Sequence, residues 1–162
     1  MSINFFNNKI GFSVSSPITT EIKGGIEKKI MPYLPKDWNK ITEDQRCPED
    51  HTHMFLTGKI NNNVVVDIDI KQSYYDMMPE FPEVEQAFTV ETYRGFHIYF
   101  NWREGLTSTS NVCPDRYEGV DVKTDGGFVF MPPTKYTLDD GTVAEYKAKG
   151  GEWNTDMSDE LF

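Results

Sequence analysis

The segment spanning residues 64–70 constrains the fold of this chain more than any other feature. Its sequence, Val-Val-Val-Asp-Ile-Asp-Ile, is a β-branched run typical of a buried strand, yet two carboxylates interrupt it. Because side chains alternate along a strand, Asp67 and Asp69 leave the same face about 7 Å apart. Two acids on one face of an apolar strand are costly unless something neutralises them. The pattern therefore favours a divalent cation, which prefers oxygen ligands.

The composition indicates one globular domain. The chain has 162 residues, of which 38% are hydrophobic and 14% aromatic, enough to build a sizeable core. No apolar stretch reaches the length of a membrane span, and the N-terminus lacks the features of a signal peptide. Cys47 and Cys113 do not suggest a disulfide framework. We therefore expect a soluble, intracellular protein without a membrane partner.

The net charge of −10 argues against strong electrostatic attraction to DNA. The first 60 residues are nearly balanced, so the acidic excess lies in the part that contains Asp67 and Asp69. Several further acids cluster after residue 150. A tight, salt-resistant grip on DNA by this chain alone is not expected, although bound metals and a local basic patch could override the overall charge.

Apolar runs and turn signals predict a strand-rich α+β fold with a mixed or mostly antiparallel sheet. A hairpin is expected from residues 54–60 and 64–70 around the turn Asn61-Asn62-Asn63. A second hairpin is expected from residues 136–138 and 143–146 around Asp139-Asp140-Gly141. The other expected strands are 9–13, 89–93, 96–100, 120–122 and 128–131.

Two regions are expected to contain only short elements. Residues 21–62 carry Gly24-Gly25 and several prolines, which indicates a loop-rich layer. Residues 72–88 are partly helix-prone, but Pro79 and Pro82 limit any helix there to short pieces.

Two more polar residues interrupt predicted strands. His97 lies between Phe96 and Ile98, whose side chains point to the other face of the predicted strand. Asp121 lies between two valines in the same manner. Each has an ordinary structural explanation: a hydrogen-bonded core histidine, or an acid that begins a turn. The Asp67/Asp69 pair could likewise be surface acids on an edge strand. Their shared strand context nevertheless suggests that all of them face one cleft.

Such a set suits phosphoryl transfer between nucleotides. Two metal ions need paired carboxylates and a third acid, here Asp67, Asp69 and Asp121. A nearby histidine and basic side chains would hold a triphosphate, whose charge spreads in the transition state. The candidates for that role are His97, Arg94 and Lys123.

A zinc site is the other metal hypothesis. Cys47, His51, His53 and Cys113 are ligand types that zinc prefers. Their spacing matches no zinc motif, because Cys113 lies far from the other three. Random scatter is the better explanation.

The order of these segments resembles the primase–polymerase (prim-pol) domain of the archaeo-eukaryotic primase superfamily, which is common in viral and plasmid replication proteins. The family's first motif is a hydrophobic strand with an acid-x-acid pair, matched by Asp67 and Asp69. The second is a small residue, any residue and histidine, matched by Gly95 and His97. The third is a hydrophobic strand with one acid, matched by Asp121.

The most distinctive match is the Gly-Gly-aromatic run that ends in Pro-Pro-Thr, residues 126–134. Residues 35–38 and 55–58 also resemble the lead-in to the first motif, so the likeness covers most of the chain. Two positions depart from the pattern, because many members have serine at the position of Gly95 and arginine at that of Lys123. Lysine keeps the charge but loses bidentate contact with phosphate.

The resemblance implies a fold, a catalytic site and a set of partners. The fold would be related to the RNA-recognition motif: a central sheet with flanking helices and a smaller unit. Residues 1–155 would form the catalytic domain, and the acidic end, 156–162, would lead toward a further region. The activity would be template-directed nucleotidyl transfer with Mg²⁺ or Mn²⁺ in a two-metal site held by Asp67, Asp69 and Asp121. The partners would be a single-stranded DNA template, (d)NTPs contacted at Gly95 and the basic candidates, and a helicase region or replication partner.

Two other functions remain open. The acidic charge and short length fit a nucleotide- or single-stranded-DNA-binding module that is inactive as a fragment of a larger primase-helicase. The acidic stretch 159–162, which ends in phenylalanine, would suit a docking motif of an interaction protein. Primer extension and nucleotide titration together separate the enzyme from the module.

Overall fold

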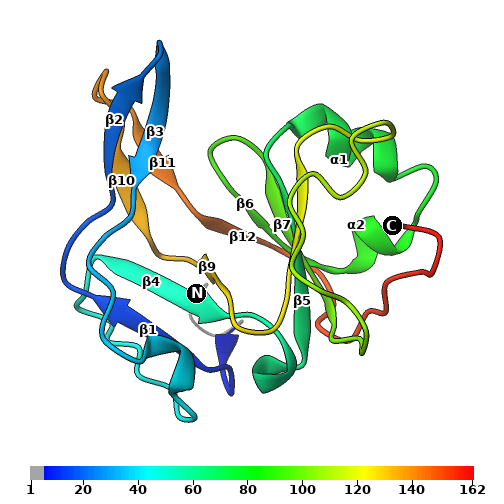
Figure 1. Ribbon diagram of the computed structural model, residues 1–162, viewed down its shortest axis with the longest axis horizontal. Coiled ribbons are helices and arrows are strands. Elements are labelled where there is room, and N and C mark those ends of the chain that lie inside the picture. The colour runs from blue at the N-terminus through cyan, green and yellow to red at the C-terminus, as the bar shows by residue number, and fades with distance from the viewer. Residues whose placement is uncertain (1–5) are drawn as a thin grey trace.

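Two β-sheets form the body of the computed structural model, which describes residues 6–162 (Figure 1). Every pairing between their strands is antiparallel. The three-stranded sheet has the order β1-β4-β9, with β1 at Gly11–Val14, β4 at Thr52–Leu56 and β9 at Phe128–Phe130. The five-stranded sheet has the order β12-β6-β7-β5-β8, with β12 at Lys147–Gly150, β6 at Phe88–Glu91, β7 at Phe96–Asn101, β5 at Asn63–Ile68 and β8 at Val120–Lys123.

Two hairpins rise together beside the three-stranded sheet, at the upper left of Figure 1. One consists of β2 (Thr19–Lys23) and β3 (Ile26–Ile30), and the other of β10 (Lys135–Thr137) and β11 (Val143–Glu145). The second hairpin was expected. The first replaces part of the loop-rich layer predicted for residues 21–62, and its two-residue turn is Gly24-Gly25, both with positive φ.

The predicted hairpin between residues 54–60 and 64–70 is wrong, because β4 and β5 belong to different sheets. A short 3₁₀ helix, η3 (Lys59–Asn61), turns the chain from one sheet to the other. The side chain of Asn61 donates to the carbonyls of Ile10 and Leu56, both at 2.7 Å, which ties this corner to the three-stranded sheet. Both edges of β5 are already paired, with β7 and β8, so β4 has no edge to join.

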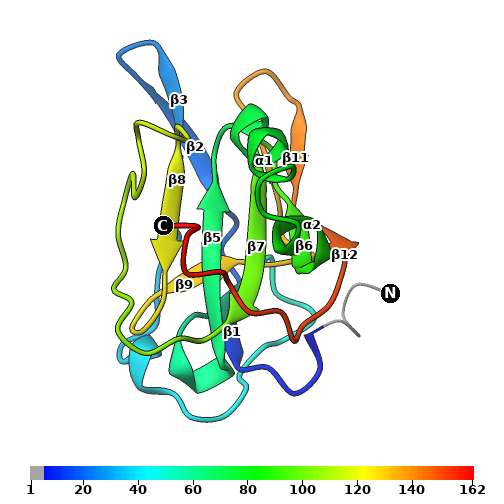
Figure 2. The ribbon, with the colours of Figure 1, turned by 90° about the vertical axis from the view of Figure 1, so that its right-hand side faces the viewer.

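The five-stranded sheet is covered differently on its two faces because its strand residues alternate. On one face Val66 and Phe96 belong to a core that also contains residues of α1 (Lys71–Met77) and α2 (Glu83–Gln86). On the other face Val65 and Tyr99 pack with side chains of the three-stranded sheet. Figure 2 shows both helices in front of the sheet. The short helices confirm the effect expected of the two prolines, and the expected mostly antiparallel sheet is confirmed.

The last seven residues pack against the helix-covered face. Met157 and Leu161 are buried in that core, and Arg103 forms an ion pair with Asp159. The proposed domain boundary at residue 155 stays a prediction. Within residues 6–162, no helix is long and apolar enough to cross a membrane.

Candidate active site

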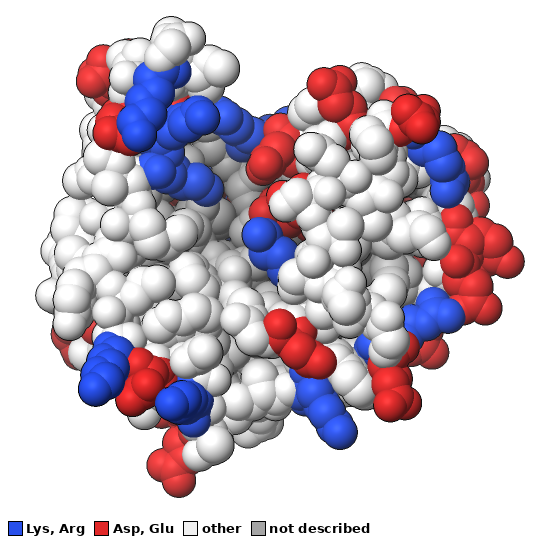
Figure 3. Space-filling view, viewed as in Figure 1, with Lys and Arg blue, Asp and Glu red and all other residues white. Residues whose placement is uncertain are grey.

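A cleft of about 910 Å³ separates the five-stranded sheet from the hairpins and the three-stranded sheet. In the face shown in Figure 3, Lys and Arg side chains gather on the hairpin side and acidic side chains lie across the hollow. The cleft is lined by all but one of the predicted site residues: Asp67, Asp69, Arg94, His97, Asp121 and Lys123.

Strand register brings the acids and the histidine together. Asp67 on β5 lies directly opposite His97 of β7 on one side and Asp121 of β8 on the other. Asp69 follows the end of β5 on the same face. The prediction that these polar residues face one cleft is confirmed, because β5 is the central strand between the two others.

His97 and Asp67 form the most buried polar pair of the cleft. His97 is 6% exposed, and its Nε2 lies 3.4 Å from Oδ1 of Asp67. Burial alone would raise the pKa of Asp67, but the nearby His97, Lys123 and Lys29 together bring that pKa below its usual range. The Nδ1 of His97 is buried and has no hydrogen-bond partner within residues 6–162. This nitrogen is available to a ligand, since buried polar atoms are normally paired.

The other two acids differ in their surroundings. Burial, followed by the charge of Asp67, raises the pKa of Asp69, and Asp121 adds to this effect. Lys29 and His97 act in the opposite direction. The Oδ1 of Asp121 accepts a hydrogen bond from the backbone N–H of Asn111 at 2.9 Å. The carboxylates therefore create a negative field that a cation would relieve.

The three carboxylates fit a hard divalent cation by their chemistry, since Mg²⁺ and Mn²⁺ prefer oxygen ligands. Their side chains do not yet converge: in the described part of the chain, no three His, Cys, Asp or Glu side chains form a group that could hold a metal. Asp67 turns toward His97, and Asp121 turns toward Asn111. Binding of one metal by all three carboxylates would therefore require their side chains to reorient.

Basic residues line the cleft on both sides. Lys123 lies on β8, beside the acids. Arg94, in the β6–β7 turn, donates to the carbonyl of Glu27 on β3 at 2.8 Å and so connects the two walls. Lys28 and Lys29 of β3 also line the cleft, and sequence reasoning missed both of them. The missed signal was Gly24-Gly25 between two strand-like runs, a recognisable hairpin pattern.

Gly95 is the one predicted nucleotide contact that does not line the cleft. An added Cβ at this position would lie 1.7 Å from the carbonyl oxygen of Ile68. The backbone of β7 therefore starts in very close contact with the end of β5. This close packing accounts for the glycine, and the nucleotide contact at Gly95 stays a prediction.

The zinc candidates are not assembled into a site. Both ring nitrogens of His53 are occupied, Nδ1 by the Ser13 hydroxyl at 2.7 Å and Nε2 by the Asp50 carbonyl at 3.0 Å. The thiol of Cys47 donates to Glu49 at 3.1 Å. His53 has a structural role in the three-stranded sheet.

The Gly-Gly-aromatic run forms the floor between the walls. Gly126 has a φ of 81°, a left-handed conformation that favours glycine, and with Gly127 and Phe128 it lines the cleft. Phe128 begins β9, and its ring lies 5.0 Å from that of Trp38 in an edge-to-face contact. This run carries the chain from the acidic wall on β8 to the opposite sheet.

Comparison with known proteins assigns this arrangement to a family. The family described as Prim-Pol, bifunctional DNA primase/polymerase, N-terminal, matches residues 23–155, which include every residue that lines the cleft except Thr20. A search of curated proteins found no match. With most of its length matched and the three acids and the histidine in one cleft, the chain belongs to the Prim-Pol family of bifunctional DNA primase/polymerase N-terminal domains.

Proposed function

We propose that this chain catalyses metal-dependent, template-directed nucleotidyl transfer from (d)NTPs during DNA replication. The observation that carries the proposal is the meeting of Asp67, Asp69, His97 and Asp121 in one cleft. These residues lie on or directly after β5, β7 and β8, which pair side by side. Membership of the Prim-Pol family supports a primase or polymerase role in general terms.

Asp67, Asp69 and Asp121 would hold Mg²⁺ or Mn²⁺ in this proposal. Such cations, when bound, lower the pKa of an attacking hydroxyl and neutralise charge on a leaving pyrophosphate. His97 helps to keep Asp67 ionised through its 3.4 Å contact. Its unpaired Nδ1 can donate to a phosphate oxygen when both ring nitrogens carry a proton. Arg94 and Lys123 add positive charge where the triphosphate would lie.

We also propose that the five-stranded sheet contains a core related to the RNA-recognition motif. The order of elements is β5-α1-α2-β6-β7-β8 and the spatial order of the strands is β6-β7-β5-β8. Both orders support this relation, since with α1 and α2 taken together as the first helical segment they fit a β-α-β-β-α-β unit. The segment between β7 and β8 would take the place of the second helix. We propose that the partners are a single-stranded DNA template and a helicase region or replication partner.

One observation favours the alternative, a module that binds nucleotide or single-stranded DNA without synthesis. Asp67 and Asp121 are engaged by His97 and Asn111, so the carboxylates do not converge. If these contacts persist when nucleotide binds, the chain would bind it without transferring it.

Primer extension with Mn²⁺ and dNTPs tests the proposal. Asp67→Asn and Asp69→Asn should abolish extension, whereas Asp115→Asn, which alters an exposed acid outside the cleft, should not. Equal activity in all three variants would refute the assignment. A parent protein that binds dATP in a calorimetric titration but yields no extended primer would support the binding module instead.

A further inference from the structure

The cleft wall opposite the carboxylates carries a lysine that lies outside the three sequence motifs. The Nζ of Lys29, on β3, donates a hydrogen bond to the hydroxyl of Tyr146 at 2.9 Å. The same ammonium lies 5.4 Å, 5.8 Å and 5.6 Å from the ring centroids of Phe130, Tyr136 and Tyr146. One hydroxyl and three aromatic rings therefore hold this cation at the wall.

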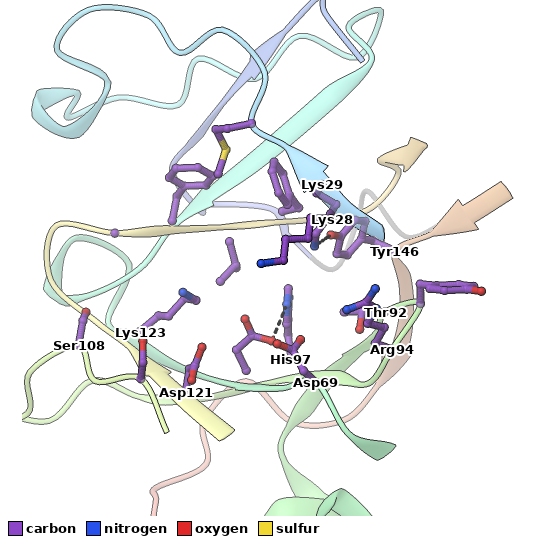
Figure 4. A pocket seen from close by; sticks show the side chains of 18 of the residues that line it. Lys28, Lys29, Asp69, Thr92, Arg94, His97, Ser108, Asp121, Lys123 and Tyr146 are labelled. Carbon is purple, nitrogen blue, oxygen red and sulfur yellow. Dashed lines mark hydrogen bonds and ion pairs between the residues drawn. The ribbon is translucent and has the colours of Figure 1, made fainter. Parts of the chain in front are cut away.

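Lys29 faces the acids of the site without pairing with them. Figure 4 shows Lys29 and Tyr146 across the cleft from Asp69 and His97. Within residues 6–162, no carboxylate oxygen lies within 4.0 Å of the Lys29 ammonium. The side chain remains accessible to solvent in the cleft. Because an ammonium has three N–H donors and Tyr146 takes one, two donors remain for a ligand.

The electrostatic surroundings of Lys29 also suit an anion. Desolvation by the surrounding protein lowers the pKa of Lys29, while the charges of Asp67 and Asp69 raise it. Lys28 and Arg94 line the same end of the cleft and add to its positive charge. In a chain with a net charge of −10, this wall is a local concentration of cations.

We propose that Lys29 binds the terminal phosphates of the incoming nucleoside triphosphate and that Tyr146 is its positioning residue. This inference rests on the proposed function. The reacting α-phosphate has to lie beside the carboxylates, so the β- and γ-phosphates extend away from them and can reach the opposite wall. A nucleoside monophosphate lacks these groups and would leave Lys29 without a contact.

A simpler role would be that Lys29 only offsets the charge of Asp67 and Asp69. In that case its removal would leave the affinity for nucleotides unchanged, or would affect triphosphates and monophosphates alike. Direct contact instead predicts a loss confined to the triphosphate. The two roles therefore predict different ratios of triphosphate affinity to monophosphate affinity in the variant.

Calorimetric titration of the whole chain with dATP and with dAMP, in Mg²⁺ and without DNA, provides the test. Lys29→Met should weaken dATP binding about 10- to 100-fold, as expected for loss of a charge-assisted contact, and leave dAMP binding within about twofold. Tyr146→Phe keeps the ring but removes the acceptor, so it should weaken dATP binding by a smaller factor. Lys23→Met is the matched control, because Lys23 lies on the same hairpin outside the cleft and its removal changes the charge equally.

Each result decides between the two roles. A selective loss for dATP in Lys29→Met supports the inference, and retained dAMP binding shows that the variant is folded. If Lys29→Met binds dATP as tightly as Lys23→Met, or loses dATP and dAMP equally, the inference is overturned. In either of those cases the proposed function still stands as long as Asp67→Asn abolishes primer extension. A parent protein that binds neither nucleotide would overturn the inference, and primer extension would then decide the proposed function separately.

Discussion

His53 and His97 are both buried strand histidines, one in each large sheet, yet their rings have opposite surroundings. In the three-stranded sheet, both ring nitrogens of His53 have partners, the Ser13 hydroxyl and the Asp50 carbonyl. In the five-stranded sheet, the Nδ1 of His97 has no partner within residues 6–162, and its Nε2 reaches only Asp67.

The same contrast extends to the polar groups nearby. Beside His53, the Thr52 hydroxyl donates to the Ser16 carbonyl at 2.8 Å, and the His53 N–H donates to Thr134 at 2.8 Å. Beside His97, the hydroxyl of Tyr99 is buried and, in the described part of the chain, unpaired. One sheet satisfies its polar groups and acts as a scaffold. The other leaves the Tyr99 hydroxyl and the Nδ1 of His97 unpaired, at a cost in stability, and of these two residues His97 lines the cleft.

Replacing His97 should produce the largest functional effect. His97→Gln keeps an amide that can donate to Asp67 but removes the imidazole and its Nδ1. We expect nucleotidyl transfer to fall about 100- to 1000-fold, as for the loss of one preorganised donor to a developing charge. Primer extension in Mn²⁺ measures the change. Activity close to that of the parent would show that the unpaired Nδ1 has no role.

The matched variant His53→Gln should affect stability instead. A glutamine amide can replace one of the two ring contacts but not both, so a buried group loses its partner. We expect the free energy of unfolding to fall by about 1–2 kcal/mol with little change in transfer rate at a temperature where the variant is folded. Urea denaturation gives the first quantity and primer extension the second. A strong loss of transfer rate in the folded variant would contradict the assignment of a purely structural role to His53.

Much of the acidic wall could be predicted from sequence, because its signal is local. Strand alternation puts Asp67 and Asp69 on one face, and His97 and Asp121 interrupt apolar strands in the same way. The opposite wall could not be predicted in the same way. Lys28 and Lys29 belong to an exposed hairpin with little apolar patterning, and Tyr146 reads only as a strand residue. Their meeting depends on tertiary structure.

The strand partners of β4 and β5 were also beyond local patterns. Residues 54–60 and 64–70 both read as strands around an asparagine-rich turn, which is typical of a hairpin. The buried Asn61 instead ties the corner to Ile10 and Leu56, and both edges of β5 are taken by more distant strands. Gly95 could not be explained from the sequence for a related reason. The Ile68 carbonyl that leaves no room for a side chain at Gly95 is brought close only by the pairing of β5 with β7.

The pH dependence of stability should show the state of His53. Burial lowers the pKa of His53 below its usual 6.5, so the folded protein keeps this ring neutral where the unfolded chain binds a proton. The unfolded state is then favoured as the pH falls through 6.5 toward the folded value. We expect the free energy of unfolding of the parent to decrease between pH 7.5 and 5.5, and less steeply in His53→Gln. Equal slopes in urea denaturation would contradict this origin.

The smallest expected effect concerns the hydroxyl of Tyr99. This group is buried and, among residues 6–162, has no hydrogen-bond partner, so the folded state bears its desolvation cost without compensation. Tyr99→Phe should leave the free energy of unfolding unchanged or raise it by up to about 1 kcal/mol. Tyr117→Phe is the matched control, because the Tyr117 hydroxyl donates to Glu80 and its loss should lower stability. If Tyr99→Phe is the more destabilising of the two, the Tyr99 hydroxyl has a hydrogen-bond partner in solution. The difference in unpaired polar groups between the two sheets is then smaller than the structure indicates.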